Sequence, residues 1–433
     1  MLESDLRTEA ARLLAELIRI DTTNPPGNET PAAEHLAGYL AGAGVESDLR
    51  GRTPERANLV ARLPGRGDGP TLMLLGHTDV VLADPDEWTV PPFAGLDRDG
   101  QVWGRGALDM KGQVAAEAVA VATLAREGWA GEGDLIYCAV ADEEVGDGYG
   151  LPWMIEHHPD LVRADYVVNE GGGERIVHGG RVAYTVGVGE KQCSAFSVTT
   201  RGRSGHASLP GASDNALLKL IPVLERISRM TGPTRDLPEL HAFLRSIGAE
   251  GADPRRLMED SRAQNPALAE IIEPMLGATL APTGVSASTR INVIPGRAQM
   301  RCDCRILPGM NQAEIETAVR EALAGLEYEF EFIERDGGTM SSPGTPLFAA
   351  IEDFLPEIEP GSTAAPVIGS GFTDSHWMRQ SFGSVAYGFM PARTDPFDAG
   401  ALVHSADERI PQDDLELAVR FFLHLCRGIG GEG

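Results

Sequence analysis

The sequence predicts an α/β fold: a mainly parallel sheet flanked by helices, with a smaller ferredoxin-like α+β domain inserted into it. Three observations lead to this prediction. Short apolar runs alternate with helical patterns over about the first 190 residues, as in parallel sheets that are covered on both faces. A β-α-β-β-α-β order follows, which is that of a ferredoxin-like domain. Finally, a chain of 433 residues is too long for one ordinary core.

The first segment, residues 1–189, contains most elements of the main sheet. The long helix among them is expected after Asp109, because the run VAAEAVAVATLA is rich in Ala and contains no Gly or Pro. The expected elements are, in order, helices at 6–20 and 32–40, strands at 58–63 and 71–75, the helix after Asp109, and strands at 135–140 and 166–168.

The second segment, residues 190–338, changes in pattern and forms the inserted domain. Its expected elements are a strand at 193–200, a helix at 215–228, strands at 283–294 and 298–307, a helix at 312–325 and a strand at 328–334. A variable stretch rich in Pro and charge separates the first helix from the second strand. Glycines and serines at 337–344 are typical of a linker back to the first domain. Residues 339–433 then complete the main domain and end in an amphipathic helix.

The composition disfavours several kinds of partner. Lys and Arg total 37 against 64 Asp and Glu, a formal net charge of −27, whereas nucleic acids and anionic membranes require basic patches. No apolar run approaches the roughly 20 residues that span a bilayer, and the N-terminus lacks the apolar core of a signal peptide. The five cysteines are scattered, with no CxxC pair. We therefore expect a cytoplasmic protein with free thiols and no membrane or nucleic-acid partner.

Side chains that bind metals follow the ends of successive predicted strands. Open α/β sheets bind ligands beyond the carboxyl ends of their strands, and imidazole and carboxylate ligands suit zinc or a similar borderline metal. Two adjacent acids allow one to bind metal while the other moves protons. The pattern therefore predicts a metal-assisted hydrolase. The residues are His77 and Asp79 in LLGHTDVV, Asp109 in GRGALDMKG, Glu143 and Glu144 in AVADEEVGDG, Glu170 in VVNEGGG and His404 in ALVHSADERI.

Each residue also has an ordinary structural interpretation. Asp79 could cap a turn, and Asp109 could be a helix N-cap. Glu170 could be a loop acid, and a single histidine such as His404 is more often structural than catalytic. Two acids at the end of a buried strand, however, repel each other unless cations are near. Their compatible positions favour a shared metal centre.

Nearly the whole chain resembles the co-catalytic dinuclear zinc metallopeptidases and deacylases. This family includes acetylornithine deacetylase, succinyl-diaminopimelate desuccinylase, aminoacylase-1, carboxypeptidase G and yeast carboxypeptidase S. The segments that carry the resemblance are IDTTNPPGNE, GHTDVV, GRGALDMKG, DEEVG, NEGGG, GHAS, INVIPG, GFTDS and HSADERI. The resemblance implies a zinc-hydrolase catalytic domain with an inserted lid or dimerisation domain.

The resemblance also implies a ligand set for two Zn²⁺ per subunit, which Co²⁺ or Mn²⁺ can replace. His77 and Glu170 would hold one zinc, and Glu144 and His404 the other. Asp109 would bridge the two through its two oxygens, and a cis peptide bond would follow it.

Two further acids are implied to take part in catalysis. Asp79 would orient the imidazole of His77, since metal-binding histidines usually give their other N–H to an acceptor. Glu143 would be the general base and then the general acid, moving a proton from the attacking water to the leaving nitrogen.

Five residues resemble the family's substrate-binding positions: His206, Asn292, Arg305, Gly371 and Thr373. By resemblance, His206 donates to the oxyanion, and in dimeric relatives it reaches the partner's site. Arg305 would grip a substrate carboxylate with its planar fork, and the loop around Gly371 would offer backbone N–H groups. Otherwise His206 is a loop histidine, Arg305 pairs with a surface acid, and the loop is an ordinary turn. A homodimer through the inserted domain is expected.

The function predicted first is dinuclear zinc-dependent hydrolysis of an amide bond in a small substrate with a free carboxylate. A metallo-carboxypeptidase or dipeptidase competes here with an N-acyl-amino-acid deacylase of the acetylornithine deacetylase or succinyl-diaminopimelate desuccinylase type, and the shared motifs do not separate them. A non-catalytic binding module should have lost a ligand or the base. A phosphoesterase lacks support, because the sequence has no Gly/Lys loop that would cradle phosphate.

Overall fold

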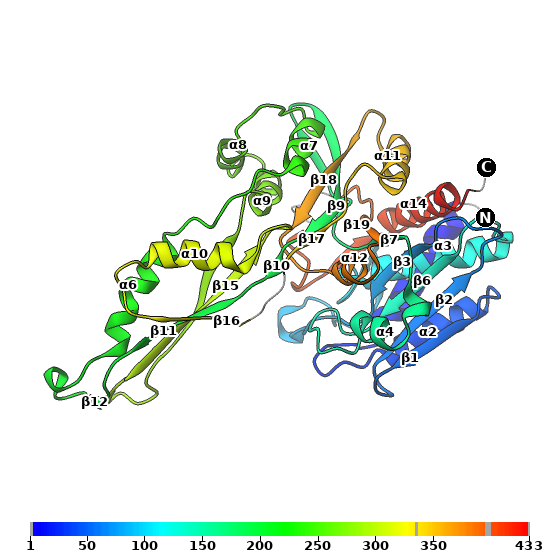
Figure 1. The fold of residues 1–433 in the computed structure, drawn as a ribbon. Coiled ribbons are helices and arrows are strands. Elements are labelled where there is room, and N and C mark those ends of the chain that lie inside the picture. Colours follow the sequence, from blue (N-terminus) through cyan, green and yellow to red (C-terminus); the bar gives the residue numbers. More distant parts are fainter. Residues whose placement is uncertain (1–2, 334–336, 395–399, 432–433) are drawn as a thin grey trace.

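The structure, a computed structural model, describes residues 3–333, 337–394 and 400–431. It confirms the predicted fold class, because a ten-stranded sheet flanked by helices and a separate five-stranded sheet are formed within these residues. Figure 1 shows the two sheets as two parts of an elongated molecule, with the N- and C-termini close together on the main part. No helix of the described residues is long and apolar enough to cross a membrane.

The main sheet has a parallel centre of four strands, β6, β3, β7 and β19, and antiparallel strands extend it. Because β3, β6 and β7 run parallel, their carboxyl ends meet at one edge of the sheet. The strands in spatial order are β1 (Ser47–Gly51), β2 (Ala57–Leu63), β6 (Leu135–Val140), β3 (Leu72–His77), β7 (Tyr166–Asn169), β19 (Val385–Gly388), β9 (Arg181–Glu190) and β17 (Thr339–Met340), with β8 (Arg175–His178) and β18 (Thr363–Gly369) also pairing with β9.

Helices cover both faces of this sheet, which explains its wholly apolar strands. The long helix α3 is buried along most of its length between the sheet, α1 and α14, and its many alanines allow this close packing. On one face lie α1 (Glu3–Ile18), α2 (Thr30–Ala41), α3 (Lys111–Glu127), α11 (Pro346–Ile358) and α14 (Gln412–Gly430); on the other lie α4 (Leu151–His157), α5 (Pro159–Val162) and α12 (Ser375–Phe382). A small sheet of β4 (Leu96–Arg98), β5 (Gln101–Trp103) and β20 (Arg409–Pro411) lies beside them.

The five-stranded sheet has the order β13-β15-β11-β16, with β10 also pairing with β15. This is the spatial order that a ferredoxin-like β-α-β-β-α-β unit produces. Its strands are β10 (Gln192–Cys193), β11 (Phe196–Arg201), β13 (Thr279–Ser286), β15 (Arg297–Ile306) and β16 (Glu329–Phe332), with α6 (Ala216–Ser228) and α10 (Gln312–Ala322) packed against it. At its far tip, β12 (Gly205–His206) pairs with β14 (Val293–Ile294) (Figure 1).

Three expected elements differ in detail. The strand expected at 283–294 is divided into β13 and β14, and β13 carries a bulge between Pro282 and Gly284. The expected linker at 337–344 contains β17, which pairs with β9. The expected strand at 328–334 is β16, and residue 334 lies outside the described residues.

The variable stretch forms three helices: α7 (Pro238–Ser246), α8 (Pro254–Ser261) and α9 (Pro266–Met275). Each begins with proline, which suits the first turn of a helix rather than breaking it. Helices α7 and α9 pack against β18 of the main sheet, as Figure 1 shows.

The chain leaves the main sheet between β9 and β10 and returns between β16 and β17. We propose that the inserted domain spans residues 190–338.

Candidate metal centre

Six of the predicted residues lie at the carboxyl edge of the parallel strands. His77 is the last residue of β3, while Glu143 and Glu144 follow β6 and Glu170 follows β7. Asp109 comes from the loop before α3, and His404 comes from the loop before β20. The fold thus brings together residues that are more than 300 positions apart. One set of ligand atoms within 4.8 Å of one another belongs to His77, Asp109 and Glu144, and a second to His77, Glu143 and Glu170.

Asp109 lies between the two histidines. Its Oδ1 is 3.1 Å from Nε2 of His77, and its Oδ2 is 3.0 Å from Nε2 of His404. Each histidine also faces a second carboxylate: Glu170 Oε2 is 3.8 Å from His77 Nε2, and Glu144 Oε1 is 3.3 Å from His404 Nε2. The peptide bond between Asp109 and Met110 is cis, as the resemblance implied.

These distances fit a pair of divalent cations. Ligand atoms about 2.0–2.1 Å from one tetrahedral ion lie roughly 3.3 Å from each other, which is close to the separations observed here. The buried Oε1 of Glu144 has no hydrogen-bond partner among the described residues, and a buried carboxylate oxygen normally requires one. Two imidazoles and three carboxylates are a donor set typical of zinc, cobalt or manganese.

The charges of the centre depend on one another. Burial opposes the charged form of His77, but hydrogen bonds to Asp109, Asp79 and Glu170 raise its pKa well above the usual value. The hydrogen bond to Asp109 and the nearby carboxylate of Glu144 raise the pKa of His404 to about 10. Burial likewise opposes ionisation of Asp109, yet hydrogen bonds from His404 and His77 lower its pKa. The carboxylates of this cluster therefore favour positive charge at the positions of the two imidazoles.

Glu143 differs from the other acids of the centre, which each lie within 4.0 Å of a histidine ring nitrogen. Among the described residues, no Lys, Arg or His side chain forms a hydrogen bond or ion pair with Glu143. Burial raises the pKa of Glu143 well above its usual value, and the negative charge of Glu170 adds to this effect. Its side chain borders a cleft between the centre and the five-stranded sheet. A carboxyl group with a raised pKa at such a position is suited to accept and donate protons.

Asp79 contacts both His77 and the backbone of Glu143 and Glu144. The sequence predicted only the contact with His77. Nδ1 of His77 lies 3.0 Å from the main-chain carbonyl oxygen of Asp79 and 3.4 Å from its carboxylate. The carboxylate accepts hydrogen bonds from the backbone N–H groups of Glu143 (3.1 Å) and Glu144 (3.2 Å), and from Asn24 Nδ2 (2.9 Å). Asp79 therefore fixes both the ring of His77 and the backbone of the two acids.

Glu408 supports the loop that carries Asp109. Its buried carboxylate accepts hydrogen bonds from the backbone N–H groups of Gly106 (3.0 Å), Leu108 (2.7 Å) and Asp109 (3.1 Å). It also pairs with Arg105 at 2.7 Å. Neither Glu408 nor Asn24 was assigned a role from the sequence, although both lie in segments that carry the family resemblance.

We expect the substitution Glu408→Ala to destabilise this loop. It leaves a buried arginine and three backbone N–H groups without their acceptor, so the free energy of unfolding should fall by about 3–5 kcal/mol. Metal affinity should fall ~10–100-fold, as for other groups that support ligands. Urea unfolding of the metal-free protein and competition with a chelator measure the two effects. The exposed acid Asp353 on α11 provides the control Asp353→Ala; equal stability of both variants would contradict this role.

His206 and Asn292 are not near the centre within one chain. Both lie at the far tip of the five-stranded sheet, where Ala207 N donates to Asn292 O at 3.0 Å and the side chain of His206 is exposed. Figure 1 places this tip, marked by β12, at the opposite end of the molecule from the main sheet. The structure thus brings these two residues together but separates them from the metal ligands.

Arg305 does face the centre. It lines a cleft of about 810 Å³ together with Glu143, Glu144 and His404. Its Nε donates to the carboxylate of Asp303, at 3.2 and 3.3 Å from the two oxygens. Arg305 therefore pairs with an acid, as its ordinary interpretation expected. This pairing is compatible with the other interpretation, in which Arg305 binds a substrate carboxylate.

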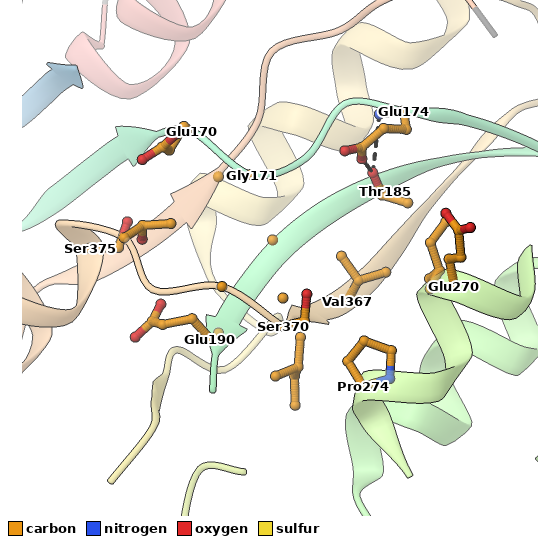
Figure 2. A pocket seen from close by; sticks show the side chains of 18 of the residues that line it. Glu170, Gly171, Glu174, Thr185, Glu190, Glu270, Pro274, Val367, Ser370 and Ser375 are labelled. Atoms are coloured by element: carbon orange, nitrogen blue, oxygen red, sulfur yellow. Dashed lines mark hydrogen bonds between the residues drawn. The ribbon is translucent and has the colours of Figure 1, made fainter. Parts of the chain in front are cut away.

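Gly371 and Thr373 line a second cavity of about 310 Å³, which also contacts Glu170. Figure 2 shows this cavity between Glu170 on one side and Glu270 and Pro274 of α9 on the other. The loop around Gly371 leads directly into α12, and Ser375 at the start of that helix accepts a hydrogen bond from Asn169. The predicted substrate loop and the candidate metal ligand Glu170 therefore line the same cavity.

Comparisons with known proteins agree with this geometry. The family model described as peptidase family M20/M25/M40 matches residues 73–428. A succinyl-diaminopimelate desuccinylase from Maricaulis maris is 26% identical over 381 residues, which covers 86% of this chain and 84% of that protein.

Two solved structures extend the comparison. An M20 family metallo-carboxypeptidase from Sulfolobus solfataricus superposes with a TM-score of 0.73 at 19% identity, covering 98% of this chain and 99% of that one. A Bacillus subtilis protein described as a dinuclear metal-binding peptidase of the M20 family gives a TM-score of 0.63 at 15% identity, covering 98% of each chain. At these identities the two structures establish a shared fold.

Proposed function

The chain belongs to peptidase family M20/M25/M40, a family of metal-dependent hydrolases that act on amide bonds, and from that premise we propose that it is a dinuclear zinc metallo-carboxypeptidase or dipeptidase. Its substrate would be a small peptide with a free carboxylate. The observation that carries the proposal is the position of Asp109, whose two oxygens face His77 and His404 separately.

Each residue of the centre has a task in this reaction. His77 and Glu170 would hold one cation, Glu144 and His404 the other, and Asp109 both. The bound cations would activate water and polarise the scissile carbonyl. Glu143 would accept the proton of the attacking water and return it to the leaving nitrogen, which suits a carboxyl group with a raised pKa. Co²⁺ or Mn²⁺ would support the same roles.

The substrate would occupy the two spaces beside the centre, which are the cleft lined by Arg305 and the cavity lined by Gly371 and Thr373. Arg305, oriented by Asp303, would bind the free carboxylate in the cleft. The loop of Gly371 and Thr373 would contact the part of the substrate that lies nearest Glu170. A substrate bound in this way presents its amide carbon between Glu143 and the positions of the cations.

The second candidate is N-acyl-amino-acid deacylation. It is favoured by the relative from Maricaulis maris, whose similarity covers most of both chains. A non-catalytic binding module is disfavoured, since the ligand set and Glu143 all converge. The test is a screen of dipeptides and N-acyl amino acids with zinc- and cobalt-loaded protein, with Glu143→Gln as the blank. Hydrolysis of neither class would contradict the proposal.

We further propose that the protein is a homodimer in which His206 acts on the partner's site. The tip that carries His206 and Asn292 lies far from the centre of its own chain (Figure 1). Exposed apolar side chains surround it, and α6 and the edge strand β13 contribute Leu218, Ile221 and Val285. Exposed large apolar side chains on a helix and an edge strand are suited to bury one another in a protein interface.

Mixing two inactive variants tests this arrangement. In a heterodimer of His206→Ala and Glu143→Gln, one site combines an intact Glu143 with an intact His206 from the partner. Equal mixing after dissociation should therefore restore about a quarter of wild-type activity, since half of the dimers carry one working site of two. Unchanged, additive residual activity would show that His206 acts within its own chain or not at all.

A cytoplasmic location is also proposed. The buried Cys138, Cys302 and Cys304 are thiols that form no disulfide in the structure, as expected where the cell keeps thiols reduced. The net charge of −27 disfavours nucleic-acid and anionic membrane partners.

A further inference from the structure

The cleft of about 810 Å³ separates the candidate metal centre from the five-stranded sheet. Glu143, Glu144 and His404 border it on one side, and residues of β10, β13 and β15 border it on the other. A substrate whose amide lies at the metal centre must contact this second wall. The charges on that wall can therefore contribute to the choice of substrate.

Strand β15 places two arginines on this wall. Side chains alternate along a strand, and Met300, Cys302 and Cys304 are buried in the core of the five-stranded sheet. Arg301, Asp303 and Arg305 consequently share the opposite face, and all three line the cleft.

The two arginines differ in their partners. Arg305 donates through Nε to Asp303, so its charge is balanced. Arg301 is exposed, and it forms no ion pair with any carboxylate in residues 3–333, 337–394 or 400–431. An arginine that pairs with none of the described carboxylates, on the cleft wall opposite the candidate catalytic acids, is suited to bind an anion.

The side chain of Arg301 lies beside the neighbouring strand β13. β13 carries its bulge between Pro282 and Gly284, and Thr283 from the bulge lines the cleft. Gly284 pairs with Arg301, and a Cβ atom at position 284 would lie 3.4 Å from Nε and Nη2 of the guanidinium. The guanidinium of Arg301 therefore lies over β13, at ordinary van der Waals distance from the position of a side chain at residue 284.

We propose that Arg301 is a specificity-determining residue that binds a second carboxylate of the substrate, so that the enzyme prefers dicarboxylate substrates. The inference rests on the proposed function and names its substrate class. Arg305 binds the first carboxylate, as proposed above. The Cα atoms of the two arginines, four residues apart on one strand, are about 13 Å apart, and their long side chains can converge on two carboxylates of one small molecule.

The second carboxylate has two chemical sources. It belongs either to an acidic residue at the carboxyl end of a peptide or to a dicarboxylic acyl group. Matched pairs that differ only in this charge distinguish them. Ala-Glu is compared with Ala-Gln for the first source, and N-succinyl-alanine with N-succinamoyl-alanine for the second.

The experiment measures kcat/KM for both pairs with the zinc-loaded wild type and Arg301→Gln. The matched control is Arg297→Gln, on the same face of β15 but outside the cleft lining. We expect the wild type and Arg297→Gln to prefer the charged member of one pair by ~10–100-fold, the range that a hydrogen bond to a charged group supplies. In Arg301→Gln the ratio should fall to near one. A folding defect lowers both rates and leaves their ratio unchanged.

Binding of products separates this inference from the proposed function. Titration calorimetry with glutamate against glutamine, and succinate against succinamate, should show the same charge preference in the wild type and its loss in Arg301→Gln. Equal ratios in the wild type and Arg301→Gln, in rates or in binding, would overturn the role of Arg301 and leave the proposed hydrolysis intact. Charge-selective binding without hydrolysis of any substrate would support Arg301 and overturn the proposed function.

Discussion

Replacing Glu143 by Gln is expected to abolish turnover while both metal ions stay bound. The substitution keeps the shape of the side chain but removes the group that accepts and returns the proton. Loss of a general acid and base typically costs ~10²–10⁴-fold in rate, and here one residue would perform both steps. Single-turnover hydrolysis and metal analysis of the same preparation measure the two quantities.

The matched control is Asp147→Asn, an exposed acid in the same loop. It removes one negative charge near the centre without touching it, and its activity should remain close to wild type. If Glu143→Gln keeps activity within a few-fold of wild type, Glu143 is not the base. If it instead loses a metal ion, Glu143 is a ligand.

Asp109→Asn is expected to have the second largest effect. The amide keeps one oxygen and replaces the other with an NH₂ group, which cannot bind a cation. The variant can therefore serve one metal position but not both. Bound metal should fall from two ions per chain to one, and kcat/KM by ~10³-fold or more, since several kcal/mol of charge stabilisation is lost.

Thermal unfolding provides an independent measure of the same change. Ligands that bind only the folded state stabilise it in proportion to their occupancy. Added zinc should therefore raise the Tm of Asp109→Asn less than that of the wild type. Asp353→Asn, which alters an exposed acid on α11, should respond to zinc as the wild type does. Two tightly bound ions in Asp109→Asn would show that this residue is no bridge.

Parts of the site could be predicted because parallel topology is regular. His77, Glu144 and Glu170 each follow an apolar strand, and the carboxyl ends of parallel strands share an edge of the sheet. Asp109 and His404 come from loops, whose paths are not fixed by local pattern. The sequence pattern named both as candidate ligands, but the pairing of His404 with Glu144 on one metal depended on the family resemblance.

Other parts could not be predicted, for identifiable reasons. Glu408 and Asn24 act by binding backbone N–H groups and other carboxylates, and such partners leave no periodic signal in a sequence. No element was predicted in the stretch before β13 that is rich in Pro and charge, yet its prolines begin helices α7, α8 and α9. Sequence also placed His206 and Asn292 in one domain without showing that they lie at its far tip.

The proposed mechanism requires Asp109 to bridge two metal ions while Glu143 remains free of them. Anomalous diffraction at the zinc absorption edge, from crystals of the zinc-loaded protein, locates both ions. We expect two peaks roughly 3.5–4 Å apart, one beside His77 and Glu170 and the other beside His404 and Glu144, with one oxygen of Asp109 on each. A single peak, or a peak coordinated by Glu143 in place of Glu144, would contradict it.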